Sequence, residues 1–210
     1  MPEPTPLFPP PGADHSAETR KRLRQAARAA RHAFAAGLNP LTRRALEQAL
    51  CAQILPHLGP PGVLGSHAAI GDEIDPRAIE DAARASGWRL AFPRVGEGPL
   101  SYHRAGRADL APGYKGIPEP PAEAPLARPD VLLVPLLAAD LRGNRLGQGG
   151  GHYDRTLAAL RASGPVLAIG IAFDLQLEAG IPAAPWDQPL DAIATPTAFH
   201  LTHGPARRAP

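Results

Sequence analysis

The sequence predicts an α/β protein in which a layered, largely parallel sheet carries helices on both faces within one Rossmann-like domain. Apolar segments of strand length alternate with segments of helical period, a pattern typical of sheets covered by helices. Residues 131–137 form a near-continuous apolar run, as expected of a strand buried on both faces. With 210 residues, 44% of them hydrophobic, the chain is long enough for one domain with a substantial core.

The N-terminal part predicts a tail and two helices. Residues 1–17 are rich in proline and lack the basic start and apolar stretch of a secretion signal, so we expect a disordered tail. Residues 18–36 and 41–55 have helical periodicity, separated by a Gly-Leu-Asn-Pro sequence that stops one helix and starts the next. The single cysteine, Cys51, lies in the second helix and is expected to be buried rather than reactive.

The body of the chain then alternates between strands and helices. Residues 76–86 and 153–162 have the helical pattern, and residues 166–172 are expected to form a strand. Further strands are expected at residues 63–70, 88–92 and 131–137. Residues 96–128 are irregular, with one short strand near 100–103, and they predict either a functional lid or ligand wall or a surface connector. We expect the folded domain to span residues 18–203, with a short C-terminal tail at 204–210.

Composition excludes several classes of protein. The net charge is only +2, so no broad basic field favours nucleic acid as a partner. No apolar run is long enough to cross a membrane, and a single cysteine cannot form an internal disulfide. We therefore expect a cytoplasmic protein that binds neither membranes nor nucleic acid.

The most informative segment is a glycine-rich loop between an expected strand and an expected helix. Five of the nine residues from 143 to 151 are glycine. Free backbone N–H groups and the positive end of a helix dipole would meet there, which favours an anion such as phosphate. Arg142 and Arg145 add positive charge, and Asp154 is a candidate metal ligand. The loop matches neither the P-loop nor the dinucleotide fingerprint, and a glycine-rich connector is the plain alternative.

The loop also resembles a specific family signature. From Gly143 to Asp154 it is similar to the motif of 5-formyltetrahydrofolate cyclo-ligases, also called methenyltetrahydrofolate synthetases. Shorter matches follow the family's order along the chain. They are Leu23-Arg24, Asp72-Glu73-Ile74, Phe92-Pro93-Arg94, the Gly-Ile-Pro-Glu-Pro sequence at 116–120, and Pro185-Trp186-Asp187 followed by Asp191.

The resemblance implies a nucleotide site. In the family a basic helix contacts ATP phosphates; Arg24 matches it, the family's lysine falls on Arg20, and Lys21 would substitute if the register differs. Arg145, Tyr153 and Asp154 are the implied catalytic residues. The implied ATP-binding residues are Arg20, Lys21, Arg24, Arg145, Leu146, Gly147, Gln148, Gly149, Gly150, Gly151, His152 and Tyr153.

The resemblance also implies a folate site and a Mg²⁺ site. Glu73 matches the family's substrate-binding glutamate, although by itself it would indicate a helix-start acid; Asp75 is the better N-cap candidate. Asp154 and Asp187 match the acids associated with Mg²⁺, which commonly uses one or two carboxylates with phosphate oxygens. His152 stands where the family often has tyrosine. The remaining implied substrate contacts are Gln148, Gly149, Gly150, Gly151 and His152.

The implied reaction is ATP- and Mg²⁺-dependent cyclisation of 5-formyltetrahydrofolate to 5,10-methenyltetrahydrofolate. It would release ADP and phosphate through a phosphorylated formyl intermediate and would be carried out by a monomer. One alternative is a sugar-phosphate isomerase or transferase that uses the loop only to hold phosphate. Another is a nucleotide- or RNA-binding module that uses the basic first helix.

Overall fold

A computed structural model describes residues 17–202 of the chain. The expected C-terminal tail and all but the last residue of the expected N-terminal tail lie outside the described residues. Ala17 already belongs to the first helix, one residue earlier than expected. The α-helices are α1 (Ala17–Ala36), α2 (Pro40–Ile54), α3 (Arg77–Ala85) and α4 (His152–Ser163). Short 3₁₀ helices are η1 (Leu55–His57), η2 (Arg107–Asp109), η3 (Tyr114–Gly116) and η4 (Asp174–Gln176).

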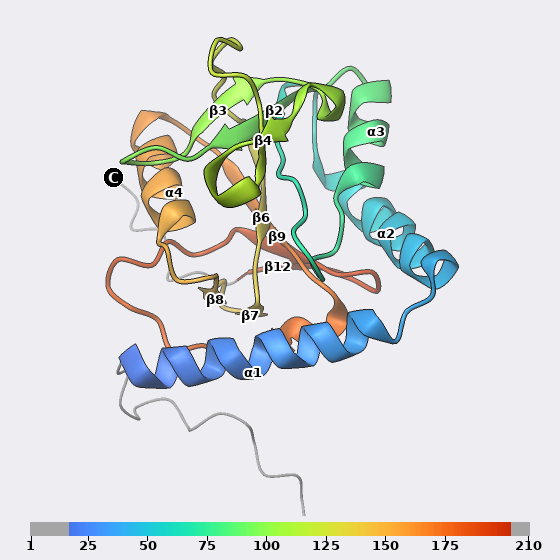
Figure 1. Cartoon of the computed structure of the whole chain (residues 1–210), viewed down its shortest axis with the longest axis vertical. Coiled ribbons are helices and arrows are strands. Elements are labelled where there is room, and N and C mark those ends of the chain that lie inside the picture. Colours follow the sequence, from blue (N-terminus) through green and yellow to red (C-terminus); the bar gives the residue numbers. More distant parts are fainter. Residues whose placement is uncertain (1–16, 203–210) are drawn as a thin grey trace, which may run out of the picture.

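A seven-stranded sheet forms the centre of the molecule, in the order β12-β11-β9-β6-β1-β2-β3 (Figure 1). The five inner strands from β11 to β2 are parallel, and the two edge strands, β12 and β3, are antiparallel to their neighbours. The predicted largely parallel α/β sheet is therefore confirmed. Its strands are β1 (Val63–Gly65), β2 (Arg89–Arg94), β3 (Ser101–Arg104), β6 (Val131–Pro135), β9 (Leu167–Ile171), β11 (Ala192–Ala194) and β12 (Phe199–Leu201).

Helices cover both faces of this sheet because its central strand alternates its side chains between two apolar cores. Val131 and Leu133 of β6 pack with residues of α2 and α3, including the buried Cys51. Leu132 and Val134 pack on the other face with Leu157 of α4. Figure 1 shows α2 and α3 on one side of the sheet and α4 on the other.

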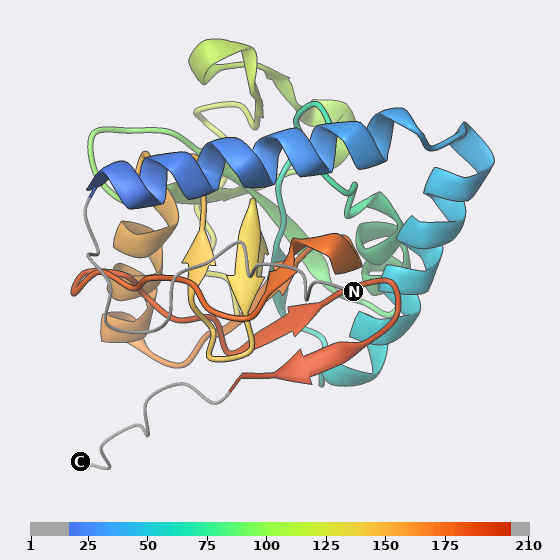
Figure 2. The ribbon, with the colours of Figure 1, turned by 90° about the horizontal axis from the view of Figure 1, so that it is seen from below.

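Helix α1 does not belong to either layer. It runs across the carboxyl-terminal side of the parallel strands, as Figures 1 and 2 show from two directions. Leu23 of α1 packs in a third, small core with Leu137 and Leu146. The helix therefore closes the side of the sheet where ligands bind in open α/β folds.

Two smaller sheets complete the fold. One has the order β10-β7-β8 and consists of β10 (Leu177–Glu178), β7 (Ala138–Asp140) and β8 (Arg145–Leu146). The other pairs β4 (Ala111–Pro112) with β5 (Pro118–Glu119) inside the irregular region. No helix among residues 17–202 is long and apolar enough to cross a membrane.

The strand expected at residues 63–70 was too long. β1 ends at Gly65, and a loop of residues 66–76 leads to α3. The loop leaves the sheet because Gly71 turns with a φ of 58° and Ile70 and Glu73 bond to each other instead of to a neighbouring strand. Similarly, Asp75 does not occupy the N-cap of α3, which is Pro76, but its carboxylate still accepts from the backbone N–H of Arg77 at 2.9 Å.

Candidate active site

A cavity of about 430 Å³ opens at the carboxyl ends of β1 and β6. In the sheet, β2 lies on one side of β1 and β6 lies on the other. The loops that follow β1 and β6 therefore diverge. A crevice at such a switch point is the usual ligand site of an open α/β sheet. The loop after β1 contributes Glu73 to the wall, and the segment after β6 contributes Leu136 and Leu137.

The glycine-rich loop is anchored by a buried aspartate in the β7–β8 hairpin. Asp140 is 1% exposed and accepts hydrogen bonds from the backbone N–H groups of Arg142 at 3.0 Å, Asn144 at 3.1 Å and Ile181 at 2.8 Å. Gly143 makes the turn with a φ of 88°. This hairpin was not predicted, but it fixes the start of the glycine-rich loop firmly against the rest of the fold.

The far end of the loop leads into α4. Gly151 is the N-cap of α4 and is left-handed, with a φ of 66°. The first N–H groups of a helix have no partner within the helix, and they carry partial positive charge. Gly147, Gly149 and Gly150 line the cavity beside them. The geometry offers a backbone surface on which an anion can approach closely.

Arg145 and Asp154 form a partly buried ion pair at this surface. An Arg145 guanidinium nitrogen lies 2.7 Å from Asp154 Oδ1, and the arginine side chain is only 6% exposed. Arg145 also donates to the carbonyl of Gln188, whose own N–H donates to Asp154 Oδ1 at 3.0 Å. Burial lowers the pKa of Arg145, and Asp154 opposes that effect. Arg145 is thus a fixed cation at the cavity wall.

Helix α1 supplies two more arginines to the same region. Arg20 pairs with Asp187 at 2.6 Å, and Arg24 donates to the carbonyl of Gly147 at 3.1 Å. Lys21, which was expected to replace Arg20 only in a shifted register, points away: its side chain is 64% exposed and lies 3.7 Å from Glu18. The structure therefore brings Arg20, rather than Lys21, to the cavity.

The other loop residues divide between cavity and core. Gln148, His152 and Tyr153 line the cavity, whereas Leu146 is fully buried in the small core under α1. Burial lowers the pKa of His152, with Arg155 and Lys115 adding to the effect, so its ring is neutral near pH 7. Burial raises the pKa of the Tyr153 hydroxyl.

Asp154 and Asp187, the two acids matched to Mg²⁺, both line the cavity. Among residues 17–202, no three His, Cys, Asp or Glu side chains lie close enough to hold a metal ion by themselves. Mg²⁺ in nucleotide sites commonly uses one or two carboxylates together with water and phosphate oxygens. The donor set therefore fits Mg²⁺ that arrives with a polyphosphate, and does not fit an all-protein metal cage.

Glu73 lies deep in the cavity, not at a helix start. It is 7% exposed, and its carboxylate accepts from the N–H of Ile70 at 3.1 Å. Arg31 of α1 lies 3.6 Å from the other carboxylate oxygen. Burial raises the pKa of Glu73, while the bond from Ile70 and the charge of Arg31 oppose the rise. Because α3 begins only at Arg77, the helix-start interpretation of Glu73 does not apply.

Sequence reasoning missed two arginines that serve this site. Arg28 donates to the side-chain oxygen of Gln148 at 2.6 Å, and Arg31 pairs with Glu73 and donates to the carbonyl of Leu136 at 3.2 Å. The signal was present in the sequence, because Arg20, Arg24 and Arg28 follow each other at helical spacing of four and so share one face. That basic face of α1 is directed at the cavity.

The irregular region forms one wall of the cavity. Tyr114, Lys115 and residues 117–119 line it. Lys115 has a φ of 52°, which is uncommon for a residue other than glycine, and the Tyr114 ring meets the His152 ring edge to face at 6.4 Å. Of the two interpretations left open for this region, the structure favours the ligand wall.

Comparison with known proteins agrees with this geometry. A model of the 5-formyltetrahydrofolate cyclo-ligase family matches residues 15–196. The chain belongs to this family. It is 41% identical over 102 residues to the 5-formyltetrahydrofolate cyclo-ligase of Escherichia coli K12, a stretch that covers 47% of this chain and 54% of that protein. It is 33% identical over 142 residues to the protein of the same name from Mycolicibacterium smegmatis, covering 62% of this chain and 72% of that one.

The chain thus spans about half the length of the first of these cyclo-ligases and more of the second. Solved structures extend the likeness over most of the fold. The NMR structure of Aquifex aeolicus 5,10-methenyltetrahydrofolate synthetase superposes with a TM-score of 0.67 at 26% identity, covering 90% of this chain and 96% of that one. A synthetase from Mycoplasma pneumoniae has a TM-score of 0.62 at 22% identity, covering 84% and 98%, and supports the fold alone.

Proposed function

We propose that the protein is a 5-formyltetrahydrofolate cyclo-ligase that uses ATP and Mg²⁺ to form 5,10-methenyltetrahydrofolate, ADP and phosphate. The observation that carries the proposal is the convergence of separate matched segments on one cavity. Arg24 from α1, Glu73 from the loop after β1, the glycine-rich loop and Asp187 all line it. A connector rich in glycine would not require these distant residues to meet.

The chemistry calls for activation of a poor electrophile. The formamide oxygen of the substrate is a bad leaving group, but it departs readily as phosphate once it has received the γ-phosphoryl group of ATP. N10 of the folate then attacks the formyl carbon and releases its proton to solvent, the carbon–oxygen bond breaks as phosphate departs, and the ring closes. The transfer depends mainly on positioning and charge neutralisation, so no side-chain nucleophile is needed.

The residues of this chain suit that task. Arg24 and Arg145 place fixed positive charge beside the glycine-rich loop, and the free amides at the start of α4 favour phosphate oxygens. Asp154 and Asp187 would hold Mg²⁺, which when bound neutralises phosphate charge during the transfer. Glu73 is a buried acceptor for the amino and ring N–H groups of the folate.

The alternatives gain no support from the geometry. An RNA-binding module would present its basic helix outward, but Arg20, Arg24, Arg28 and Arg31 all contact groups of the cavity region. A sugar phosphate also has no pterin N–H groups for the buried carboxylate of Glu73 to accept from. We further expect the enzyme to act as a cytoplasmic monomer without membrane or nucleic-acid partners.

The direct test mixes purified protein with 5-formyltetrahydrofolate, Mg²⁺ and ATP, and follows the absorbance of the methenyl product together with ADP. We expect the methenyl product and ADP in equal amounts. The methenyl product should form only when ATP is present, and ADP only when 5-formyltetrahydrofolate is present. Substrate labelled with ¹⁸O in the formyl group should transfer its label to the released phosphate. Methenyl product without ADP, or ATP hydrolysis that ignores the folate, would overturn the proposal.

A further inference from the structure

Among residues 17–202, one buried histidine of the cavity wall has a ring without a well-formed hydrogen bond. His67 follows β1, is 4% exposed and lines the cavity. Within residues 17–202, neither of its ring nitrogens makes a hydrogen bond of normal geometry, and the nearest candidate partner is the backbone of Leu133. Leaving a buried polar group unsatisfied costs about 1–3 kcal/mol, so such a group in a ligand cavity calls for an explanation.

A second buried histidine shows what a purely structural role looks like in this fold. His103 of β3 is 7% exposed, and both of its ring nitrogens are occupied: Nε2 lies 3.0 Å from Ser101 Oγ, and Nδ1 lies 2.7 Å from the carbonyl oxygen of Ala124. His103 does not line the cavity, whereas His67 does. The ring of His103 is therefore fully used by the fold, whereas the ring of His67 lies in the cavity wall, where a ligand contact is made.

The ring of His67 is neutral at physiological pH. Burial and then the positive charge of Arg107 lower its pKa to about 4, while a polar contact with the Leu133 backbone and the charge of the Asp75 carboxylate act in the other direction. A neutral imidazole has one N–H donor and one acceptor nitrogen. It therefore suits an uncharged planar ligand group better than a phosphate.

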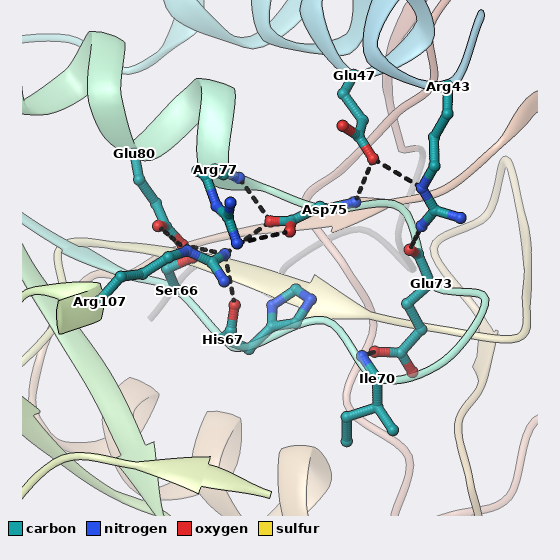
Figure 3. Close-up of polar contacts among 10 residues, drawn as sticks. All are labelled: Arg43, Glu47, Ser66, His67, Ile70, Glu73, Asp75, Arg77, Glu80 and Arg107. Carbon is teal, nitrogen blue, oxygen red and sulfur yellow. Dashed lines mark hydrogen bonds and ion pairs between the residues drawn. The ribbon is translucent and has the colours of Figure 1, made fainter. Parts of the chain in front are cut away.

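The loop that carries His67 is held rigidly by ion pairs (Figure 3). Arg107 binds Glu80 at 2.6 Å and Asp75 at 2.8 Å, and it also reaches the backbone carbonyl of His67 at 3.4 Å. Farther along the loop, Arg43 donates to the carbonyl of Glu73. In Figure 3 the His67 ring carries none of these bonds, so the network fixes the backbone without using the ring. Such preorganisation lowers the entropy that binding would consume.

The position of His67 assigns it to the folate end of the cavity. Arg24 touches the glycine-rich loop and Arg31 touches Glu73, and these two arginines are about 10 Å apart along α1 at 1.5 Å per residue. His67 shares a small recess with Arg31 and Glu73. The wall near them is mostly apolar and includes Ala68 and Ile70, as expected where a flat ring binds beside a few polar groups.

We infer that His67 is a substrate-binding residue that forms a hydrogen bond with the pteridine ring system of 5-formyltetrahydrofolate, next to the contact made by Glu73. The inference rests on the proposed function and adds a residue to its folate site. The neutral ring can form a hydrogen bond with either a donor or an acceptor of the pteridine, whereas the Glu73 carboxylate can only accept hydrogen bonds.

The test compares His67→Phe with His67→Gln, which keeps hydrogen-bonding capacity. Calorimetry measures the dissociation constant for 5-formyltetrahydrofolate without nucleotide, and separately that for a non-hydrolysable ATP analogue with Mg²⁺. We expect His67→Phe to weaken folate binding about tenfold, the loss of one buried neutral hydrogen bond, with nucleotide binding unchanged. His67→Gln should recover part of the loss, and KM for folate should rise more than kcat falls.

His103→Phe is the matched control: it should lower the melting temperature because Ser101 and Ala124 lose a partner, without a selective change in folate affinity. Wild-type folate affinity in His67→Phe, or an equal loss of folate and nucleotide affinity, would overturn the role of His67 but not the proposed function. A wild-type protein that binds no folate would instead overturn the proposed function.

A measurement on the unmodified chain guards against a variant that fails to fold. In ¹H–¹⁵N spectra of histidine-labelled protein, the ring nitrogen signals of His67 should shift when folate is added, because one ring nitrogen gains a hydrogen bond. An unaltered His67 signal in the complex would contradict the assignment.

Discussion

Two glycines of the same loop should respond in opposite ways to alanine. A Cβ added at Gly147 meets no atom within 4 Å, and Gly147 lines the cavity. A Cβ added at Gly143 would lie 2.6 Å from the carbonyl oxygen of Leu190, at a φ of +88°. If the loop binds phosphate through its backbone, Gly147→Ala should impair ligand binding, and Gly143→Ala should impair folding.

The magnitudes follow from these surroundings. Gly147→Ala should change the free energy of unfolding by no more than about 0.5 kcal/mol, as for other substitutions in open space. A methyl group that blocks one charge-assisted hydrogen bond to phosphate should cost about 1.5–3 kcal/mol, or about 10- to 150-fold in the dissociation constant of the nucleotide. For Gly143→Ala the left-handed backbone alone costs about 1–2 kcal/mol, a fall of about 2–8 °C in melting temperature, before the clash is counted.

Calorimetric titration with a non-hydrolysable ATP analogue and Mg²⁺ measures the first effect, and thermal unfolding without ligand measures the second. Each variant is the control for the other, since both add one methyl group to the same loop. Wild-type nucleotide affinity in Gly147→Ala would refute backbone binding of phosphate at this position. An unchanged melting temperature in Gly143→Ala would refute the packing against Leu190.

Three further predictions concern charges and rings around the cavity. Arg31→Met removes an opposing charge from Glu73, so the pKa of Glu73 should rise further and the loss of folate affinity on acidification should begin at a higher pH; an unshifted pH profile would contradict the Arg31–Glu73 pairing. Arg107→Met leaves the buried Glu80 carboxylate without its cation and should destabilise the fold by about 3 kcal/mol at pH 7. Burial already raises the pKa of Glu80, so protonation of Glu80 at lower pH should remove the cost of its unpaired charge in Arg107→Met. The difference in melting temperature between this variant and the wild type should therefore narrow as pH falls. A difference that does not change with pH would contradict the Arg107–Glu80 pairing. Trp186 is 71% exposed and lines the cavity, whereas Trp88 is 4% exposed, so nucleotide should change tryptophan fluorescence in the wild type but not in Trp186→Phe.

Much of the fold was predictable because its main elements carry their own signals. Strand β6 is buried on both faces, so its apolar run is continuous, and α1 and α4 have clear helical patterns. The β7–β8 hairpin has no comparable signal. Its strands are two and three residues long, and it depends on Asp140, whose bonds to Arg142, Asn144 and Ile181 exist only once the chain has folded.

The site was predictable where a long motif identified it and unpredictable where the fold assembled it. The glycine-rich loop is continuous in sequence, so its residues could be named without a structure. Arg31 looks like one more solvated charge until α1 crosses the sheet and brings it to Glu73, which is distant in sequence. His67 lies in an apolar segment that predicted a longer strand, and only the early end of β1 places it in the cavity wall.

The most direct test of the account is a crystal structure of the protein with a non-hydrolysable ATP analogue, Mg²⁺ and 5-formyltetrahydrofolate. We expect phosphate oxygens on the backbone amides of residues 147–151 beside Arg145, with Mg²⁺ at Asp154 and Asp187. The pteridine ring should lie against Glu73 and His67, and its formyl oxygen should face the terminal phosphate. Nucleotide bound away from the glycine-rich loop, or folate bound outside this cavity, would contradict the account.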